Sequence, residues 1–263
     1  MIISTRKIKI PKNHPRAHSL MIRERLIENI KSGVVAPAGL IAHGRGEAFD
    51  YLLGEQTTAP AKKAIRAAAA LLLTAQYPVI SVNGNVAALV TKPIAELAKI
   101  TKSKVEVNLF YRSPKREMAI KKILHKAGIN EVLGTDRTFQ VKIPGMSSDR
   151  RRVDSRGILI ADVVLVPLED GDRTQALVKM GKKVIAVDLN PLSRTAQQSS
   201  ITIVDNIIRV MPILISQIQI LKNRKKFYLQ KVIQNYNNKL ILNEAVSLIN
   251  KRLVRIAHKQ SKK

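Results

Sequence analysis

Polar residues follow each of five apolar segments in this chain, and these residues are the first candidates for chemistry. The apolar segments lie within 78–84, 104–110, 161–168, 182–190 and 199–206. If they are parallel strands of one sheet, their carboxyl ends meet at one edge, where ligands bind in open α/β sheets. We therefore predict a ligand site along that edge. The polar groups after the five segments are Asn83, Gly84 and Asn85; Asn108, Tyr111 and Arg112; Glu169, Asp170, Gly171, Asp172, Arg173 and Thr174; Asp188, Leu189, Asn190, Ser193, Arg194 and Thr195; and Asp205 and Asn206.

Each polar group has a functional and a purely structural interpretation. The Asn83-Gly84-Asn85 turn opens a helix whose free N–H groups attract phosphate, but such turns also simply join strands to helices. It lacks the spacing of the dinucleotide fingerprint and of the P-loop. Asp188 can bind ribose hydroxyls or cap a helix, and the two readings are equally open.

The charged residues at the same edge suit an anionic ligand. Arg112 and Arg194 can hold phosphates, although exposed arginines usually have no specific role. The acidic run 169–172 offers oxygen ligands for Mg²⁺, or a counter-charge for an amine. It can equally cap the helix predicted after it.

Residues 43–50 (HGRGEAFD) place charged side chains inside an apolar stretch. His43, Arg45, Glu47 and Asp50 are either a buried ion-pair cluster or part of a site, and we favour the site. Gly44 and Gly46 would let the backbone turn sharply or approach a ligand. His43 has no second His or Cys at metal-binding spacing, which argues against catalytic zinc. Serine-hydrolase and zinc-protease motifs are also missing from the sequence.

The elements that must position these residues follow from periodicity. Apolar spacing predicts a helix over 16–31, and Thr58 and Pro60 open an alanine-rich helix. Strands and helices then alternate from 78 to 206, with 134–160 as a polar excursion. An apolar helix over 207–221 and one or two helices within 228–258 complete the chain. We predict an α/β protein with a Rossmann-like, doubly wound, mostly parallel sheet, divided into N-terminal helices (1–77), the core (78–210) and a C-terminal helical appendage (211–263).

Composition narrows the function classes further. The chain has 263 residues and no cysteine, which excludes disulfides, thiolate nucleophiles and iron–sulfur clusters, and fits a cytoplasmic protein. No apolar run approaches the ~20 residues of a membrane span. The net charge is +27, of which residues 222–263 contribute 12 Lys and Arg against one Glu. Such a charge suggests nucleic acid, but aromatic residues make up only 3% and offer few stacking platforms for single strands.

Several long segments closely resemble the archaeal phosphopantothenate synthetase family. They are residues 12–26, 38–55, 77–90, 107–112, 161–182 and 187–206, and the likeness runs from about residue 11 to 210. The resemblance implies a ligase of coenzyme A biosynthesis that joins 4-phosphopantoate to β-alanine. It further implies ATP as co-substrate, a phosphopantoyl-adenylate intermediate, release of AMP and diphosphate, a Rossmann-like ATP site, and a homodimer.

The resemblance also suggests roles for individual residues. It places ATP on Arg23, Arg45, Asp188, Leu189, Asn190, Ser193, Arg194, Thr195, Asp205, Asn206 and Ile207. We assign 4-phosphopantoate to Asn83, Gly84, Asn85, Tyr111 and Arg112. Arg45 is expected near the α-phosphate and the substrate carboxylate, with Mg²⁺ as a further counter-charge but no assigned metal ligand. Candidates for accepting the amine proton are Glu47, Asp170, Asp172 and His43, or solvent.

Two other functions compete with the ligase. A basic nucleic-acid-binding module is the alternative, because of the +27 charge and the basic C-terminal segment. A dehydrogenase on the same fold is disfavoured, since the glycine fingerprint is missing. The ligase interpretation requires Arg45, Asn85, Asp188 and Arg194 to share one cavity.

Overall fold

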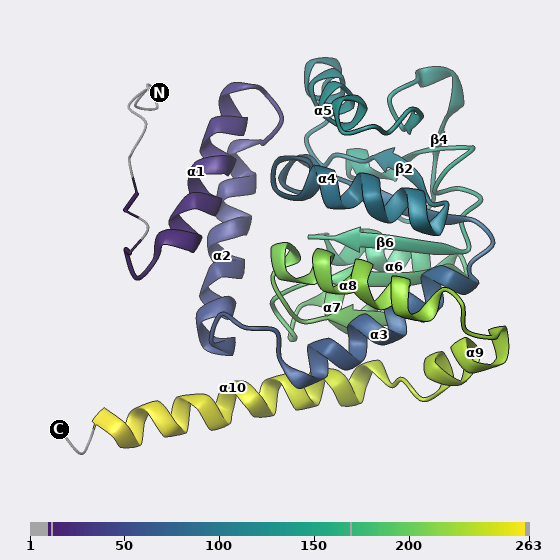
Figure 1. The fold of residues 1–263 in the computed structure, drawn as a ribbon. Helices are drawn as coiled ribbons and strands as arrows, with labels where there is room; N and C mark the ends of the chain where they lie inside the picture. Colours follow the sequence, from purple (N-terminus) through teal and green to yellow (C-terminus); the bar gives the residue numbers. More distant parts are fainter. Residues whose placement is uncertain (1–9, 12, 169, 261–263) are drawn as a thin grey trace.

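The computed structural model describes residues 10–11, 13–168 and 170–260. Within them, six parallel strands form one sheet in the order β3-β2-β1-β6-β7-β8 (Figure 1). The bounds are β1 Pro78–Val82, β2 Lys104–Val107, β3 Val132–Leu133, β6 Val163–Pro167, β7 Lys183–Val187 and β8 Ile201–Ile203. These buried, β-branched runs are typical of a sheet covered on both faces. The fold class is confirmed; β3 was not predicted.

The strand order reverses between β1 and β6, which pair from Pro78↔Val163 to Ile80↔Leu165. The chain builds outward from β1 to β2 and β3, returns to β6, and then builds the other way to β7 and β8. The connections after β1 and β6 therefore diverge to opposite faces and leave a crevice at the carboxyl edge.

Helices of different origin cover the two faces. One face packs against α3 (Ala59–Thr74), α4 (Gly84–Thr101), α5 (Pro114–Lys126) and α8 (Ile207–Leu221). The other packs against α6 (Gly171–Lys179) and the excursion between β3 and β6, with the short α7 (Arg194–Gln198) beside α6. Helix α4 has a kink at Val90, because Pro93 cannot donate a backbone hydrogen bond.

The excursion is not a simple loop. Its strands β4 (Gln140–Lys142) and β5 (Arg152–Asp154) pair antiparallel, and the 3-10 turns η1 (Arg137–Phe139) and η2 (Asp149–Arg151) flank and connect them. Val153 is buried in this ribbon and packs against the α6 side of the sheet.

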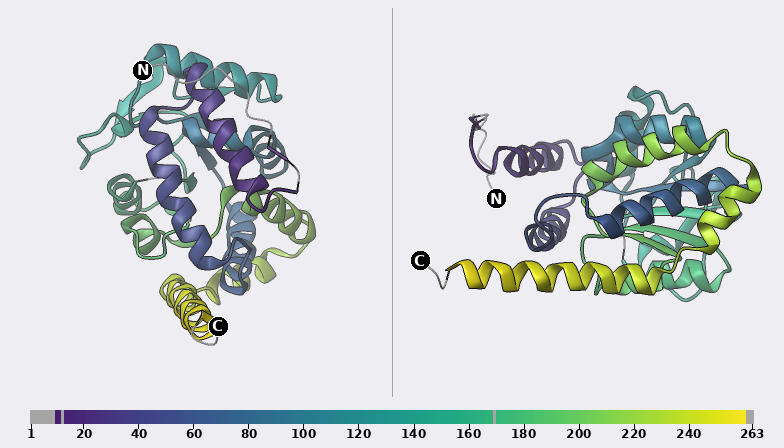
Figure 2. Two further views of the ribbon diagram at one scale, coloured as in Figure 1. Left: turned by 90° about the vertical axis from the view of Figure 1, so that its left-hand side faces the viewer. Right: turned by 60° about the horizontal axis from the view of Figure 1, so that its bottom comes forward.

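The N-terminal helices α1 (Ala17–Lys31) and α2 (Pro37–Leu53) stand at one end of the sheet (Figure 1). At the opposite end of the chain, α9 (Lys226–Gln234) leads into the long α10 (Asn238–Gln260), whose last turns project beyond the body of the molecule (Figure 2). Among the described residues, no helix combines the length and apolarity needed to cross a bilayer.

Candidate active site

A cleft of about 790 Å³ lies where α2 faces the carboxyl edge of the sheet. Arg45, Asn85, Asp188 and Arg194 all line it, so the required shared cavity exists. The residues proposed from sequence that line the cleft are His43, Arg45, Asn83, Gly84, Asn85, Tyr111, Asp170, Gly171, Asp188, Leu189, Asn190, Ser193, Arg194, Thr195, Asn206 and Ile207.

Helix α2 forms one wall because its glycines allow close approach. Asn85 Nδ2 donates to the Gly39 carbonyl at 2.9 Å, and a Cβ added at Gly39 would lie 2.4 Å from Asn85 Oδ1. A Cβ at Gly46 would lie 3.4 Å from Leu189 Cδ1. The sharp turn considered for Gly44 and Gly46 is wrong, since 37–53 is one helix; the close approach occurs along the helix face instead.

Several helices begin at the cleft. Asn83 accepts the Val86 N–H at 3.1 Å and starts α4, while Asp170 accepts the Arg173 N–H at 2.9 Å and starts α6. Asn206 starts α8 by accepting the Ile208 N–H at 3.2 Å. Free N–H groups and helix dipoles at such positions attract anions. The cleft therefore suits a ligand with several negative groups.

Asn83 also ties the crevice together. Its Nδ2 donates to the carbonyls of Pro167 (3.1 Å) and Leu168 (3.0 Å), across the reversal point between β1 and β6. The amide thus caps one helix and joins the two loops that open the cleft.

Asp188 organises the turn after β7. Its carboxylate accepts the Asn190 N–H at 2.9 Å and the Ser193 hydroxyl at 2.5 Å. Burial raises the pKa of Asp188, whereas these hydrogen bonds and the positive charge of Arg45 lower it. Part of the carboxylate's bonding capacity is therefore used within the turn, which holds Ser193 at the start of α7.

Arg116 and Arg150 also line the cleft, although the sequence did not single them out. Arg116 Nη2 donates to the Val34 carbonyl at 3.0 Å. Arg150 forms an ion pair with Asp170 (Nη1–Oδ2 3.0 Å), and its guanidinium lies 5.8 Å from the centre of the Phe110 ring. Burial lowers the pKa of Arg150 to about 10. Arg150 belongs to a run of arginines in the excursion, and nothing in that run marks which side chain turns inward.

Some residues proposed from sequence lie elsewhere. Arg112 points into the protein, where its Nε lies 3.2 Å from Glu117 Oε1 and its Nη2 donates to the Val107 carbonyl. Asp205 is buried and accepts the Thr57 hydroxyl at 2.6 Å and the Arg209 Nε at 2.8 Å. Because both side chains are engaged inside the fold, neither lines the cleft.

The remaining acidic candidates lie at its margin. Glu47 accepts from Arg16 and Tyr51, and the exposed Asp172 pairs with Arg194 at 2.8 Å. Neither lines the cleft. Asp50, from the same motif as Glu47, is buried in an ion pair with Arg209, so for this residue the ion-pair reading holds.

His43 lines the cleft on the face of α2 that carries Gly39 and Gly46. Burial lowers the pKa of His43, and the charge of Arg23 on α1 adds to this, against the opposing charges of Glu47 and Asp50. Arg23 itself does not line the cleft. His43 is therefore predominantly neutral near pH 7 and able to accept a proton.

Within the described ranges, no group of three or more His, Asp or Glu side chains is placed to hold a metal ion. Glu169 of the acidic run lies outside the described residues. Of the carboxylates that the structure describes, Asp170 and Asp188 line the cleft.

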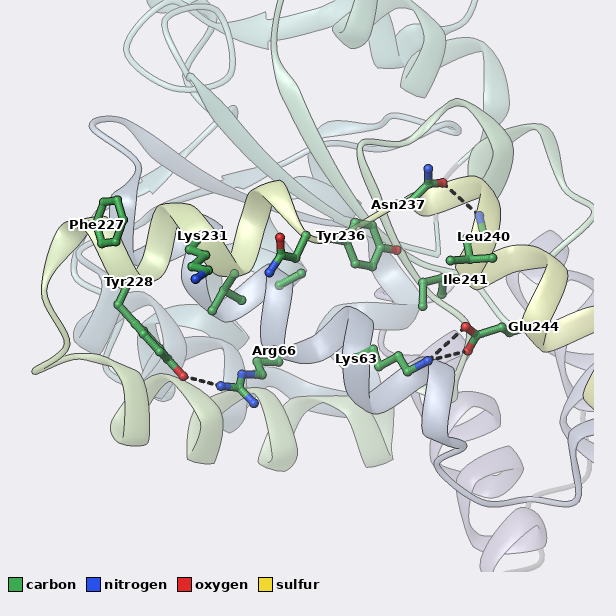
Figure 3. Close-up of a pocket in the computed structure, with 13 residues that line it drawn as sticks. Lys63, Arg66, Phe227, Tyr228, Lys231, Tyr236, Asn237, Leu240, Ile241 and Glu244 are labelled. Carbon is green, nitrogen blue, oxygen red and sulfur yellow. Dashed lines mark hydrogen bonds and ion pairs between the residues drawn. The ribbon is translucent and has the colours of Figure 1, made fainter.

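Another cavity, of about 660 Å³, lies between α3, α9 and α10 (Figure 3). Lys63 and Glu244 pair across it at 3.0 Å, and Arg66 donates to the Tyr228 hydroxyl. It contains none of the residues proposed for the site. Tyr236 on its wall nevertheless contacts β8, since its hydroxyl lies 3.3 Å from the Thr202 N–H nitrogen.

The strand order, the cleft at the reversal point and the helices that begin there define a Rossmann-like α/β protein built to bind an anionic ligand. Comparison with known proteins makes this more specific. A family model described as phosphopantothenate/pantothenate synthetase matches residues 60–252. The chain is 53% identical over 251 residues to the 4-phosphopantoate–β-alanine ligase of Thermococcus kodakarensis, covering 95% of both chains. It is 50% identical over 248 residues to the ligase of that name from Methanosarcina mazei, covering 94% of this chain and 97% of the relative. The chain therefore belongs to the phosphopantothenate/pantothenate synthetase family.

Proposed function

We propose that this protein is a ligase that condenses 4-phosphopantoate with β-alanine in coenzyme A biosynthesis, with ATP as co-substrate. Family membership and the names of its relatives support this activity. The structural observation that carries it is the meeting of Arg45, Asn85, Asp188 and Arg194, from three separate segments, in one cleft.

The reaction needs an activated acyl group, because a carboxylate offers an amine no good leaving group. In the proposed first step, a carboxylate oxygen of 4-phosphopantoate attacks the α-phosphorus of ATP, and diphosphate leaves. In the second, the amine of β-alanine attacks the acyl carbon, AMP leaves, and the amine loses a proton. No protein nucleophile is required, which agrees with a sequence free of cysteine.

We assign the nucleotide to the half of the cleft formed by the residues that follow β7 and β8. These lining residues lie within 188–195 and at Asn206 and Ile207. Arg45 faces this half, close enough to lower the pKa of Asp188. Its cation would stabilise the negative charge that develops between carboxylate and α-phosphate. Arg23 and Asp205 do not line the cleft. We therefore propose that they act on the nucleotide only indirectly, by supporting the residues that contact it.

Mg²⁺ would neutralise the triphosphate and draw charge from the diphosphate as it leaves. Asp170 lines the cleft, and its carboxylate would be the protein ligand for this ion. The same carboxylate pairs with Arg150. Other ligands would come from phosphate oxygens and water, as is usual for this ion.

His43 is the proposed acceptor for the amine proton. It lines the cleft and is predominantly neutral near pH 7, whereas Glu47 and Asp172 lie outside the cleft and Asp170 is paired. Solvent remains the competing acceptor, and His43→Gln distinguishes them. Loss of the second step with retained adenylate formation supports His43; an unchanged rate of both steps supports solvent.

A homodimer and a cytoplasmic location complete the proposal. Leu253, Val254 and Ile256 in the C-terminal half of α10 are exposed, and a second copy would cover them. The cysteine-free sequence agrees with a reducing compartment.

The activity is tested by mixing the protein with ATP, Mg²⁺, 4-phosphopantoate and β-alanine and separating the nucleotides. We expect AMP and 4′-phosphopantothenate in equal amounts. ADP as the nucleotide product would exclude the adenylate. No turnover together with tight RNA binding at physiological salt would favour the nucleic-acid-binding alternative, which the basic C-terminal segment motivates.

A further inference from the structure

The excursion between β3 and β6 contributes a cation to the cleft without belonging to the sheet. Its 3-10 turn Asp149–Arg151 carries Arg150, whose side chain lines the cleft and pairs with Asp170. A cation on such a segment is useful only if the segment is held in place. Strand β2 holds it.

Glu106 and Asn108 form this clamp. They stand two residues apart at the end of β2 and so share one face of the strand. Glu106 accepts the N–H groups of Asp154 (3.1 Å) and Ile158 (2.7 Å). Asn108 Nδ2 donates to the carbonyls of Arg152 (2.9 Å) and Arg150 (3.3 Å).

Both clamp side chains are completely buried, with 0% exposure. Gly157 lets the excursion approach this closely, because a Cβ there would lie 2.3 Å from Glu106 Oε2. Burying a carboxylate and an amide in a core costs free energy unless hydrogen bonds compensate for the lost water. Here the bonds go to the backbone of Arg150 itself and of Arg152, Asp154 and Ile158, which follow it in the chain.

The position of Arg150 along the sheet indicates what it binds. Phe110, beneath its guanidinium, follows β2, and the Asn83–Asn85 turn follows β1. Asp188 and Asn206 follow β7 and β8, on the other side of the reversal point. Arg150 and Arg116 therefore line the half of the cleft opposite the nucleotide half, where the sequence placed Arg112.

We propose that Glu106 and Asn108 are positioning residues that hold Arg150 where it binds an anionic group of the acid substrate, leaving the nucleotide half of the cleft unaffected. This rests on the proposed ligase function. The phosphate and the carboxylate of the acid are the groups a guanidinium recognises, each through charge-assisted hydrogen bonds.

The test compares Glu106→Gln, Asn108→Ala and Arg150→Lys with the unmodified protein. Glutamine keeps the size of Glu106 but turns an NH₂ group toward one of the two N–H donors, and so releases one side of the clamp. We expect KM for 4-phosphopantoate to rise about 10- to 100-fold in all three variants, since bonds to charged groups are lost or misplaced. KM for ATP should rise far less, because the residues after β7 and β8 are untouched and only Asp170, which pairs with Arg150, links the clamp to a proposed magnesium ligand.

Val153→Ala is the matched control. Val153 is buried in the same ribbon, so its truncation loosens the packing while leaving both clamp side chains in place. We expect lower thermal stability with KM for the acid unchanged. If Val153→Ala raises KM as much as Asn108→Ala does, the clamp has only a structural role and the proposal is overturned.

Calorimetric titration with 4-phosphopantoate and separately with ATP distinguishes a failure of the proposed function from a failure of the positioning role. If the unmodified protein binds neither compound, the proposed function fails. If it binds both and the clamp variants weaken ATP binding equally, or leave the acid's affinity unchanged, only the positioning role fails. Should Glu106→Gln not fold, Asn108→Ala and Arg150→Lys still decide the outcome.

Discussion

Arg45 and Arg209 show how the environment of an arginine decides what it does. Arg209 is half-buried and bonded to Asp50 and Asp205, so it holds α8 to α2. Arg45 is exposed on α2 at the cleft. Removing the first would leave buried carboxylates without their partner, whereas the second is placed to act on a ligand.

We therefore predict that Arg45→Ala folds normally and lowers ligase activity by about 10²–10³-fold. The measurement is the initial rate of AMP formation together with the circular dichroism melting curve. Arg66→Ala, which removes another exposed arginine remote from the cleft, serves as the control and should keep its activity. An Arg45→Ala protein that fails to fold would return the motif to the ion-pair interpretation.

Glu106 predicts a pH dependence of stability. Burial raises the pKa of Glu106 to about 7, against its hydrogen bonds from Ile158 and Asp154 and the charge of Arg173. The folded protein thus binds this proton more tightly than the unfolded chain, whose glutamate has a pKa near 4.5. Stability from this group is present below about pH 4.5 and is lost as the pH rises towards 7.

The difference in Tm between the unmodified protein and Glu106→Gln, measured from pH 4 to pH 8, isolates this contribution. We expect the unmodified protein to lose stability relative to the variant as the pH rises. A difference that is constant over the range would contradict the raised pKa.

At the scale of elements, the position of α2 against the sheet depends on which glycine faces inward. Gly39 packs on Asn85, whereas a Cβ added at Gly44 on the same helix would meet nothing within 4 Å. Alanine normally stabilises a helix interior relative to glycine by about 0.5–1 kcal/mol. The two positions therefore separate helix propensity from packing.

Gly44→Ala should raise the free energy of unfolding by about 0.5–1 kcal/mol. Gly39→Ala should lower it and raise KM for the substrates, because the new Cβ forces α2 away from Asn85. Urea unfolding and steady-state kinetics measure both effects. Equal behaviour of the two variants would show that α2 does not depend on this contact.

For the whole molecule, the open question is what covers the projecting part of α10. The C-terminal end of α10 extends away from the rest of the molecule (Figure 2), and Leu253 and Val254 on this helix are exposed. An apolar surface on a long helix is typical of association between copies of a chain.

Leu253→Glu should convert the proposed dimer to a monomer, which sedimentation velocity measures. Arg255→Glu, at another exposed position of the same helix, lies where the residues three and four positions away are all Lys, Arg or His, and it should leave the dimer intact. An unmodified protein that sediments as a monomer would contradict the dimer, as would a Leu253→Glu variant that stays dimeric.

Local patterns were enough to predict the parallel sheet and the edge at which ligands gather, because buried β-branched runs and the polar residues after them can be recognised without knowledge of distant contacts. It missed β3, whose pairing involves only Val132 and Leu133 and leaves no pattern to detect. Which cations face the cleft depends on the packing of the folded chain. Arg112 turns inward to Glu117 while Arg150 reaches the site from the excursion, since the direction of a side chain depends on contacts with residues far away in the chain.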